Sequence, residues 1–170
     1  INASTFTAMV TSSTLANASQ VVASAIGSLS GPLHGGANEK VIAMLEKINS
    51  KDDIRPWLDD TLKAKNVVWG MGHREYSVKD PRANILTDMV QELFDERDGG
   101  VTDIFEKAIE LEKACEEKLA HKGVYPNVDF YSGILYKEMD IPTDIFTPIF
   151  AMSRVAGWLA HWIEQIQDNK

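Results

Sequence analysis

The chain has 170 residues, a length that suits one ordinary domain or one small domain plus part of another. Its formal net charge of −8 argues against a nucleic acid as partner, and no apolar run approaches the roughly 20 residues that cross a bilayer. The single cysteine, Cys115, cannot form an internal disulfide and no signal peptide is visible, so we expect a reducing, cytoplasmic setting.

Apolar residues recur at helical spacing nearly throughout, and no strand alternation is sustained, so the pattern predicts an all-α, multi-helical fold. The first helical stretch, from Thr5 to about Ile26, is rich in Ala, Ser and Thr. Small residues permit close helix packing, so this stretch is a candidate surface for dimer or inter-helix contacts. Its imperfect apolar face consists of Phe6, Met9, Val10, Leu15, Val22 and Ile26.

A glycine-bearing loop at 27–36 precedes a second helical pattern, whose apolar face holds Val41, Ile42, Leu45 and Ile48. Residues 50–53 resemble a capping box, and Pro56 sits early in the helix that follows. Further along, residues 66–69 are apolar and lead into a Gly-Met-Gly turn.

Asp80 and Pro81 form a strong helix start, with Asp as N-cap and Pro at the first helical position. Glycines at 99 and 100 end that helix, and Thr102 begins the next one. A turn at 123–126 precedes a short helix, and the last helical pattern runs over 149–163, where Pro148 should confine or kink its start.

Basic residues gather between Lys63 and Arg82, where the net charge is +3 while the rest of the chain carries −11. A basic segment in an acidic protein favours a small anionic ligand over a long polyanion. A solvated loop with a chance cluster of charge is an equally good interpretation of the charge alone. The charged residues of this segment are Lys63, Lys65, Arg74, Glu75, Lys79, Asp80 and Arg82.

Three polar sites are candidates for chemistry. His34 lies between glycines just before a helix, whose N-terminus disfavours imidazolium, so a neutral ring there would donate a hydrogen bond to a developing enolate oxygen. His73 also follows a glycine turn, and Arg82 in the next helix start suits a carboxylate. Asp129 stands between Val128 and Phe130, where apolar surroundings raise the pKa of a carboxyl as a general base requires. Taken singly, each has a structural alternative: a turn histidine, a surface ion pair and a helix N-cap.

Other kinds of site have weaker signals. Cys115 has no histidine near it in sequence, and neither a GxSxG elbow nor a phosphate-binding GK[ST] loop occurs. His161 and Glu164 share a helix face, but such a pair is usually solvated or hydrogen-bonded, so we expect no metal site.

The whole chain resembles citrate synthase in six ordered segments. These are Asn2–Phe6, the Ser-Gly-Pro-Leu-His-Gly-Gly-Ala-Asn run from Ser30 to Asn38, Gly72-His73, Asp80-Pro81-Arg82, the Tyr-Pro-Asn-Val-Asp-Phe-Tyr-Ser-Gly run from Tyr125 to Gly133, and Ser153-Arg154 with Gly157-Trp158.

The resemblance implies condensation of acetyl-CoA with oxaloacetate, followed by thioester hydrolysis. By similarity, Asp129 removes a methyl proton, His34 stabilises the enol and His73 polarises the oxaloacetate carbonyl. Arg82 and Arg154 clamp carboxylates. The implied CoA-binding residues are Val67, Val68, Gly70, Gly72 and Lys79. Acetyl-CoA is then a co-substrate, and no tightly bound cofactor is implied.

Two departures from the family pattern concern CoA binding. Glu75 stands where the family commonly has an aliphatic residue, and Ser77 where a basic residue is usual, with Lys79 the nearest cation. Met71 is also less usual in its turn. CoA affinity is therefore expected to be lower or to depend on different contacts.

The resemblance also predicts large-domain helices over 1–36, a small CoA-binding domain over 37–150 and a return helix of the large domain over 151–170. The family pattern places a substrate-binding histidine just before Asn2 and an arginine beyond Lys170, from the partner subunit. We therefore expect a homodimeric full-length enzyme and an inactive isolated chain. Two alternatives stay open: a 2-methylcitrate synthase acting on propionyl-CoA, and a non-catalytic helical assembly module.

Overall fold

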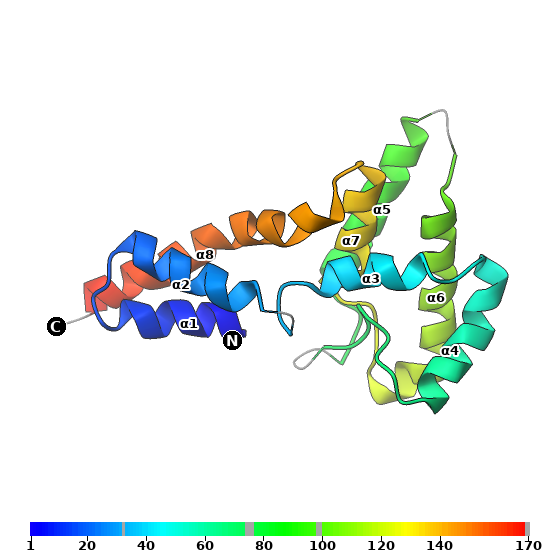
Figure 1. Ribbon diagram of the computed structural model, residues 1–170, viewed down its shortest axis with the longest axis horizontal. Coiled ribbons are helices and arrows are strands. Elements are labelled where there is room, and N and C mark those ends of the chain that lie inside the picture. Colours follow the sequence, from blue (N-terminus) through cyan, green and yellow to red (C-terminus); the bar gives the residue numbers. More distant parts are fainter. Residues whose placement is uncertain (32, 74–76, 98–99, 169–170) are drawn as a thin grey trace. The chain divides into compact units, whose positions relative to one another are not determined.

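The computed structural model describes residues 1–31, 33–73, 77–97 and 100–168, so Arg74 and Glu75 of the basic segment lie outside the described residues. Within these ranges the chain is helical and contains no β-strand, and the predicted all-α fold is confirmed (Figure 1). The helices are α1 (Ala3–Ser12), α2 (Ala18–Leu29), α3 (Ala37–Leu45), α4 (Ile54–Lys63), α5 (Pro81–Asp95), α6 (Asp103–Leu119), α7 (Val128–Glu138) and α8 (Phe146–Asp168). Short 3₁₀ turns lie at Lys51–Asp53, Ala120–Lys122 and Thr143–Ile145.

The chain divides into two compact units. Unit 1 comprises Ile1–Gly36 and Asp144–Lys170, and unit 2 comprises Ala37–Thr143. The sequence-based division into a large-domain part and a CoA-binding domain concerns function and stays a prediction; its second boundary, at 150/151, falls inside α8. Among the described helices, none is both long and apolar enough to span a membrane.

Unit 1 is built from α1, α2 and α8, which Figure 1 shows side by side. The single helical stretch predicted from Thr5 to Ile26 is interrupted, because Leu15 takes a left-handed φ of 61° and a new helix begins at Ala18. Asn17 and Gln20 form a reciprocal capping box there, with bonds of 3.0 and 3.1 Å. The core residues of this unit are Ala8, Val21, Ala25, Leu29, Ala151 and Trp158.

Most of the predicted apolar face of the first stretch is exposed, although Val22 packs against the core of unit 1. Phe6 and Leu15 are each 61% exposed, and Val10 and Ile26 are also exposed. The buried positions are mostly small, at Ser4, Ala8 and Ser12 of α1. Small side chains let α1 approach its neighbours closely, and the larger apolar side chains then point to the other side of the helix.

Unit 2 packs α3 and α5 against α7, and α4 against α6. The predicted face of α3 and the residues after it is correct, since Val41, Ile42, Leu45 and Ile48 are all buried. The capping box predicted at Ser50 is not formed: the Ser50 hydroxyl donates to Asp53 Oδ2 at 2.9 Å instead of capping a helix. Residues 51–53 form a 3₁₀ turn before α4, so the true helix start lies one turn later than the pattern implied.

Candidate active site

His34 lies in the turn after α2 and is held by the first turn of α1. The backbone N–H of Ser4 is 3.2 Å from His34 Nε2, and Ser4 Oγ is 2.9 Å from the same nitrogen. A backbone N–H can only donate, so Nε2 is the acceptor and the proton of the neutral ring is on Nδ1. The Ser4 hydroxyl also lies 3.0 Å from Asn2 Oδ1, so its proton can serve only one of these two acceptors.

The imidazole of His34 is kept neutral by its surroundings. Burial lowers the pKa of His34, and the nearby cation of Arg154 lowers it further. The sequence also predicted a neutral ring, but for another reason, the N-terminus of the following helix. In the structure the lowered pKa is due to burial and to Arg154. The turn itself needs glycine at position 35, because a Cβ there would come within 2.3 Å of the Leu29 carbonyl oxygen.

Arg154 lies on α8 and is half-buried. Its guanidinium carbon is 4.9 Å from the centre of the Phe150 ring, one helical turn earlier on the same helix. The ring supports the guanidinium without neutralising it, so a positive charge remains to act on anions and on the His34 ring. Both predicted unit 1 residues, His34 and Arg154, are thus electrostatically coupled in the structure.

The turn before His73 is shaped by two glycines in left-handed conformations, Gly70 at φ 80° and Gly72 at φ 82°. Gly70 also has no room for a side chain, since a Cβ would lie 2.8 Å from atoms of Phe130 and of Val41. The Gly72 N–H donates to the Tyr125 carbonyl at 2.7 Å. The turn therefore presses its backbone directly against the start of α7.

Asn127 is a residue whose importance the sequence reasoning missed. Its Oδ1 accepts from the Asp129 N–H at 2.9 Å, which caps α7, and its Nδ2 donates to the Gly72 carbonyl at 2.9 Å. Its backbone N–H donates to the Gly70 carbonyl, also at 2.9 Å. One side chain therefore joins the turn that leads to His73 with the turn that carries Asp129. An Asn just before a helical pattern is an N-cap signal, so the cap of α7 could have been predicted from the sequence. The bond to the Gly72 carbonyl, 55 positions away, could not.

Asp129 occupies the first turn of α7 and is half-buried beside the fully buried Phe130. Its negative charge raises the pKa of Tyr136, second in effect to the burial of that phenol. The carboxylate is therefore close enough to its neighbours to be felt electrostatically. Its assignment as a general base stays a prediction.

Arg82 and Asp80 form a closed arrangement at the start of α5. The Asp80 carboxylate is only 2% exposed and accepts from Arg82 N, Nε and Nη2 at 2.9, 3.0 and 2.7 Å. The Arg82 hydrogen bond is the main reason that the pKa of Asp80 is lowered, and the charge of His73 lowers it further. The Arg82 side chain is 45% exposed and the His73 residue is exposed, so both reach solvent.

All 170 residues match the family model "Citrate synthase, C-terminal domain". The chain belongs to the citrate synthase family. It is 56% identical over 170 residues to the citrate synthase of Synechocystis sp. and 52% identical over 170 residues to that of Acidithiobacillus ferridurans. These alignments cover the whole chain but only 42% and 44% of the relatives, so the chain spans less than half their length.

Solved citrate synthases share the fold. The crystal structure of the Thermotoga maritima enzyme matches with a TM-score of 0.89 at 45% identity, over 100% of this chain and 46% of that chain. The Thermoplasma acidophilum enzyme, solved as a ternary complex with carboxymethyl coenzyme A and oxaloacetate, matches with a TM-score of 0.90 at 37% identity. That match covers 99% of this chain and 45% of the other.

Within this member of the citrate synthase family, the predicted CoA-binding residues differ in accessibility. Val67 is 63% exposed, whereas Val68 is 7% exposed and directs its side chain into unit 2. The Lys79 ammonium lies 2.5 Å from Glu112 Oε1, so it is engaged in an ion pair. Gly70 is also buried, and Gly72 and Lys79 are half-buried, so Val67 is the one openly exposed residue among these five.

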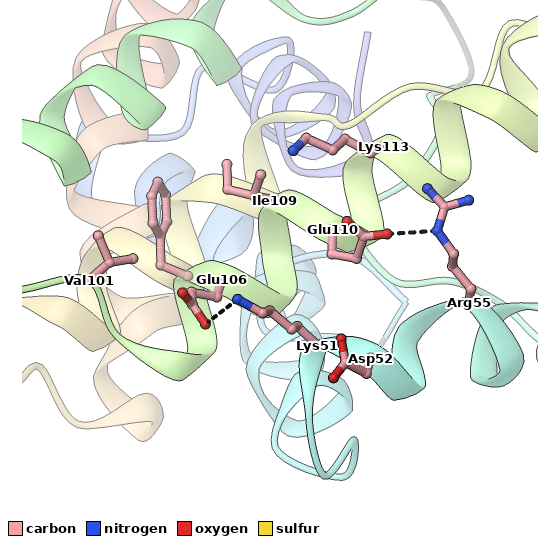
Figure 2. Close-up of a pocket in the computed structure, with 9 residues that line it drawn as sticks. Lys51, Asp52, Arg55, Val101, Glu106, Ile109, Glu110 and Lys113 are labelled. Atoms are coloured by element: carbon pink, nitrogen blue, oxygen red, sulfur yellow. Dashed lines mark hydrogen bonds and ion pairs between the residues drawn. The ribbon is translucent and has the colours of Figure 1, made fainter.

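A surface hollow of about 530 Å³ lies elsewhere in unit 2 and contains none of the citrate synthase residues predicted above. Figure 2 shows it spanned by the Lys51–Glu106 and Arg55–Glu110 ion pairs, at 3.2 and 2.7 Å. Its basic and acidic groups thus largely neutralise one another. The remaining lining residues are Asp52, Val101, Phe105, Ile109 and Lys113.

The weaker candidates have ordinary structural surroundings. Cys115 is buried, and burial, followed by the charge of Glu112, raises the pKa of its thiol to about 12, which disfavours the nucleophilic thiolate. His161 Nδ1 lies 3.4 Å from Glu164 Oε2. Over the described part of the chain, no three His, Cys, Asp or Glu side chains group as metal ligands.

Proposed function

We propose that the whole protein is a citrate synthase, which condenses acetyl-CoA with oxaloacetate and hydrolyses the thioester to give citrate and CoA. The observation that carries this proposal is the match of 99% of the chain to a citrate synthase whose solved complex holds carboxymethyl coenzyme A and oxaloacetate. Because the chain spans less than half of its relatives' length, substrates and partners are proposed for the whole protein.

The proposed roles follow the chemistry of the groups. The Asp129 carboxylate takes a proton from the acetyl methyl group, and His34 donates its Nδ1–H to the thioester oxygen as the enol forms. The resulting carbon nucleophile attacks the oxaloacetate carbonyl, which His73 polarises. Arg82 and Arg154 bind the carboxylates of that substrate. The tautomer set by Ser4 supports this assignment, because it leaves Nδ1 as the donor.

The CoA-binding segment is proposed to comprise Val67, Val68, Gly70 and Gly72. Lys79, which the resemblance adds to this set, is engaged in its ion pair with Glu112, and we assign it no direct contact with CoA. Since Val68 directs its side chain inward, we assign its contribution to the backbone. Acetyl-CoA enters and leaves as a substrate, so no tightly bound cofactor is proposed. Propionyl-CoA is the alternative acyl donor, in which case the enzyme would be a 2-methylcitrate synthase with the same catalytic groups.

A homodimer is the proposed assembly. The exposed apolar side chains of α1 and α2, Phe6, Val10 and Ile26 among them, lie on helices rich in small residues and offer a surface for close helix packing. The competing function, a helical assembly module without catalysis, would use the same surface. Light scattering of the whole protein measures the assembly, and activity separates the two functions.

The test is free-thiol release by the whole protein from acetyl-CoA in the presence of oxaloacetate. We expect turnover that requires both substrates, and slower release when propionyl-CoA replaces acetyl-CoA. Faster turnover of propionyl-CoA would identify the 2-methylcitrate synthase instead. Absence of thiol release with either donor, from a folded dimer, would favour the assembly module. The 170-residue chain assayed alone is expected to be inactive.

A further inference from the structure

Glu112, in the middle of α6, is a mostly buried carboxylate with a partner on each oxygen. Its side chain is 15% exposed. Oε1 lies 2.5 Å from the Lys79 ammonium, and Oε2 accepts the hydrogen bond of the Tyr131 phenol. A carboxylate removed from water in this way is stable only while it is paired, so the three side chains depend on one another.

The partners of Glu112 belong to the two segments that carry the predicted unit 2 site. Lys79 immediately precedes Asp80, the buried cap that holds Arg82 by three hydrogen bonds. Tyr131 lies two residues after Asp129 on α7. Both contacts lie entirely within unit 2. Glu112 itself sits on a third element and is not part of any motif in the sequence.

Tyr131 transmits this anchoring to the core of unit 2. It is fully buried, and its ring meets that of Phe130 edge to face, with centroids 5.1 Å apart and planes at 89°. The Lys79 ammonium also lies 5.8 Å from the centre of the Tyr131 ring. Phe130 in turn packs on Gly70, the first glycine of the turn before His73.

We propose that Glu112 is a positioning residue, which fixes the Lys79–Arg82 segment and the Asp129 turn of α7 in one geometry. Lys79 then acts through its ion pair with Glu112 and not by contact with the phosphates of CoA. This inference rests on the proposed function for its kinetic consequences. Small displacements of groups that bind or deprotonate a substrate cost rate far more than they cost stability.

The kinetic test compares Glu112→Gln and Lys79→Met in the whole protein, each with steady-state constants for both substrates. We expect kcat to fall roughly 10–100-fold, as misplacement of reacting groups predicts, with a raised KM for oxaloacetate and an unchanged KM for acetyl-CoA. Lys79→Arg, which can keep the ion pair, should retain kcat. The double variant Lys79→Met/Glu112→Gln should be little worse than either single variant, because both remove one interaction.

Lys118→Met is the matched control. Lys118 pairs with Asp59 on α4 and is 31% exposed, against 32% for Lys79, and it shares helix α6 with Glu112. It touches neither predicted site segment, so its loss should leave both KM values and kcat unchanged. If Glu112→Gln fails to fold, Tyr131→Phe removes only the phenol hydroxyl and should show the same pattern of kinetic changes in milder form.

Hydrogen exchange of the whole protein gives a readout that needs no activity. Amides of residues 77–82 should exchange faster in Lys79→Met and Glu112→Gln, while those of α4 keep their wild-type rates. Three results together would overturn the inference: a raised KM for acetyl-CoA in Lys79→Met, kinetic effects of the two substitutions that add in the double variant, and unchanged exchange at 77–82. Lys79 would then be a CoA contact. Wild-type protein without synthase activity would instead refute the proposed function, and the exchange result would still decide whether Glu112 positions this segment.

Discussion

The two histidine regions of the molecule are built in opposite ways. His34 in unit 1 is half-buried. Ser4 sets its tautomer, and burial, followed by the charge of Arg154, lowers its pKa and keeps the ring neutral. His73 in unit 2 is exposed, and what is fixed there is the backbone that leads to it, through Gly70, Gly72 and Asn127. The structure around His34 fixes a protonation state, whereas the structure around His73 fixes a backbone conformation. Substitutions should therefore disturb a pKa in one and a geometry in the other.

The largest effect is expected from Asp129→Asn in unit 2, which keeps the size of the side chain and removes its basicity. Thiol release by the whole protein should fall by roughly 10²–10⁴-fold, the usual contribution of a general base. Asp88→Asn is the matched control, since Asp88 is an exposed carboxylate on α5 and should leave the rate unchanged. A rate for Asp129→Asn within about two-fold of wild type would remove Asp129 from the mechanism.

Gly70→Ala should break the geometry of the second region. The substitution places a Cβ 2.8 Å from Phe130 and Val41 at a φ of 80°, so we expect a loss of about 2–5 kcal/mol in the free energy of unfolding. Gly27→Ala is the control: it adds a Cβ within α2 that meets nothing within 4 Å, and should stabilise unit 1 by about 0.5–1 kcal/mol. Urea unfolding of both variants measures the difference, and equal behaviour would contradict the close packing at Gly70.

Asn127→Ala should weaken the same region less. Loss of the α7 cap costs about 0.5–2 kcal/mol, and the Gly72 carbonyl loses its side-chain donor as well. Asn127→Asp restores the capping acceptor but not the donor, so it separates the two roles. If the aspartate variant has the wild-type midpoint in urea and wild-type kinetics, the hydrogen bond from Asn127 to the Gly72 carbonyl contributes to neither stability nor activity.

Arg154→Ala should shift the protonation of His34 in the first region. Without the nearby cation, the pKa of His34 rises toward its ordinary value, although burial still holds it lower. A histidine whose pKa is lowered on folding supports stability above its ordinary pKa of about 6.5 and loses that support as the pH falls through its folded pKa. The variant should therefore lose less stability over this window than wild type does. NMR titration of His34 measures the shift, and an unchanged pKa would show that Arg154 does not act on the ring.

Much of the fold was predictable because its signals are local. The helix starts at Asp80 and Thr102 each depend on a side chain that accepts from a backbone N–H two or three residues ahead. The apolar face from Val41 to Ile48 likewise follows from spacing within one segment. The face of α1 was mispredicted, because which side of a helix is buried depends on its partners, and α1 is buried through small residues.

The candidate site was predictable as a set of residue types, through the family resemblance of its motifs. The sequence by itself determined the helical fold, the capped starts of α5 and α6, and the histidine, arginine and aspartate candidates that the resemblance named. Only the tertiary structure decided that Ser4 sets the tautomer of His34, 30 positions away, and that Glu112 joins Lys79 to Tyr131. The physical reason is that caps and turns close within a few residues, whereas a buried charge or ring takes its state from whatever the folded chain packs around it.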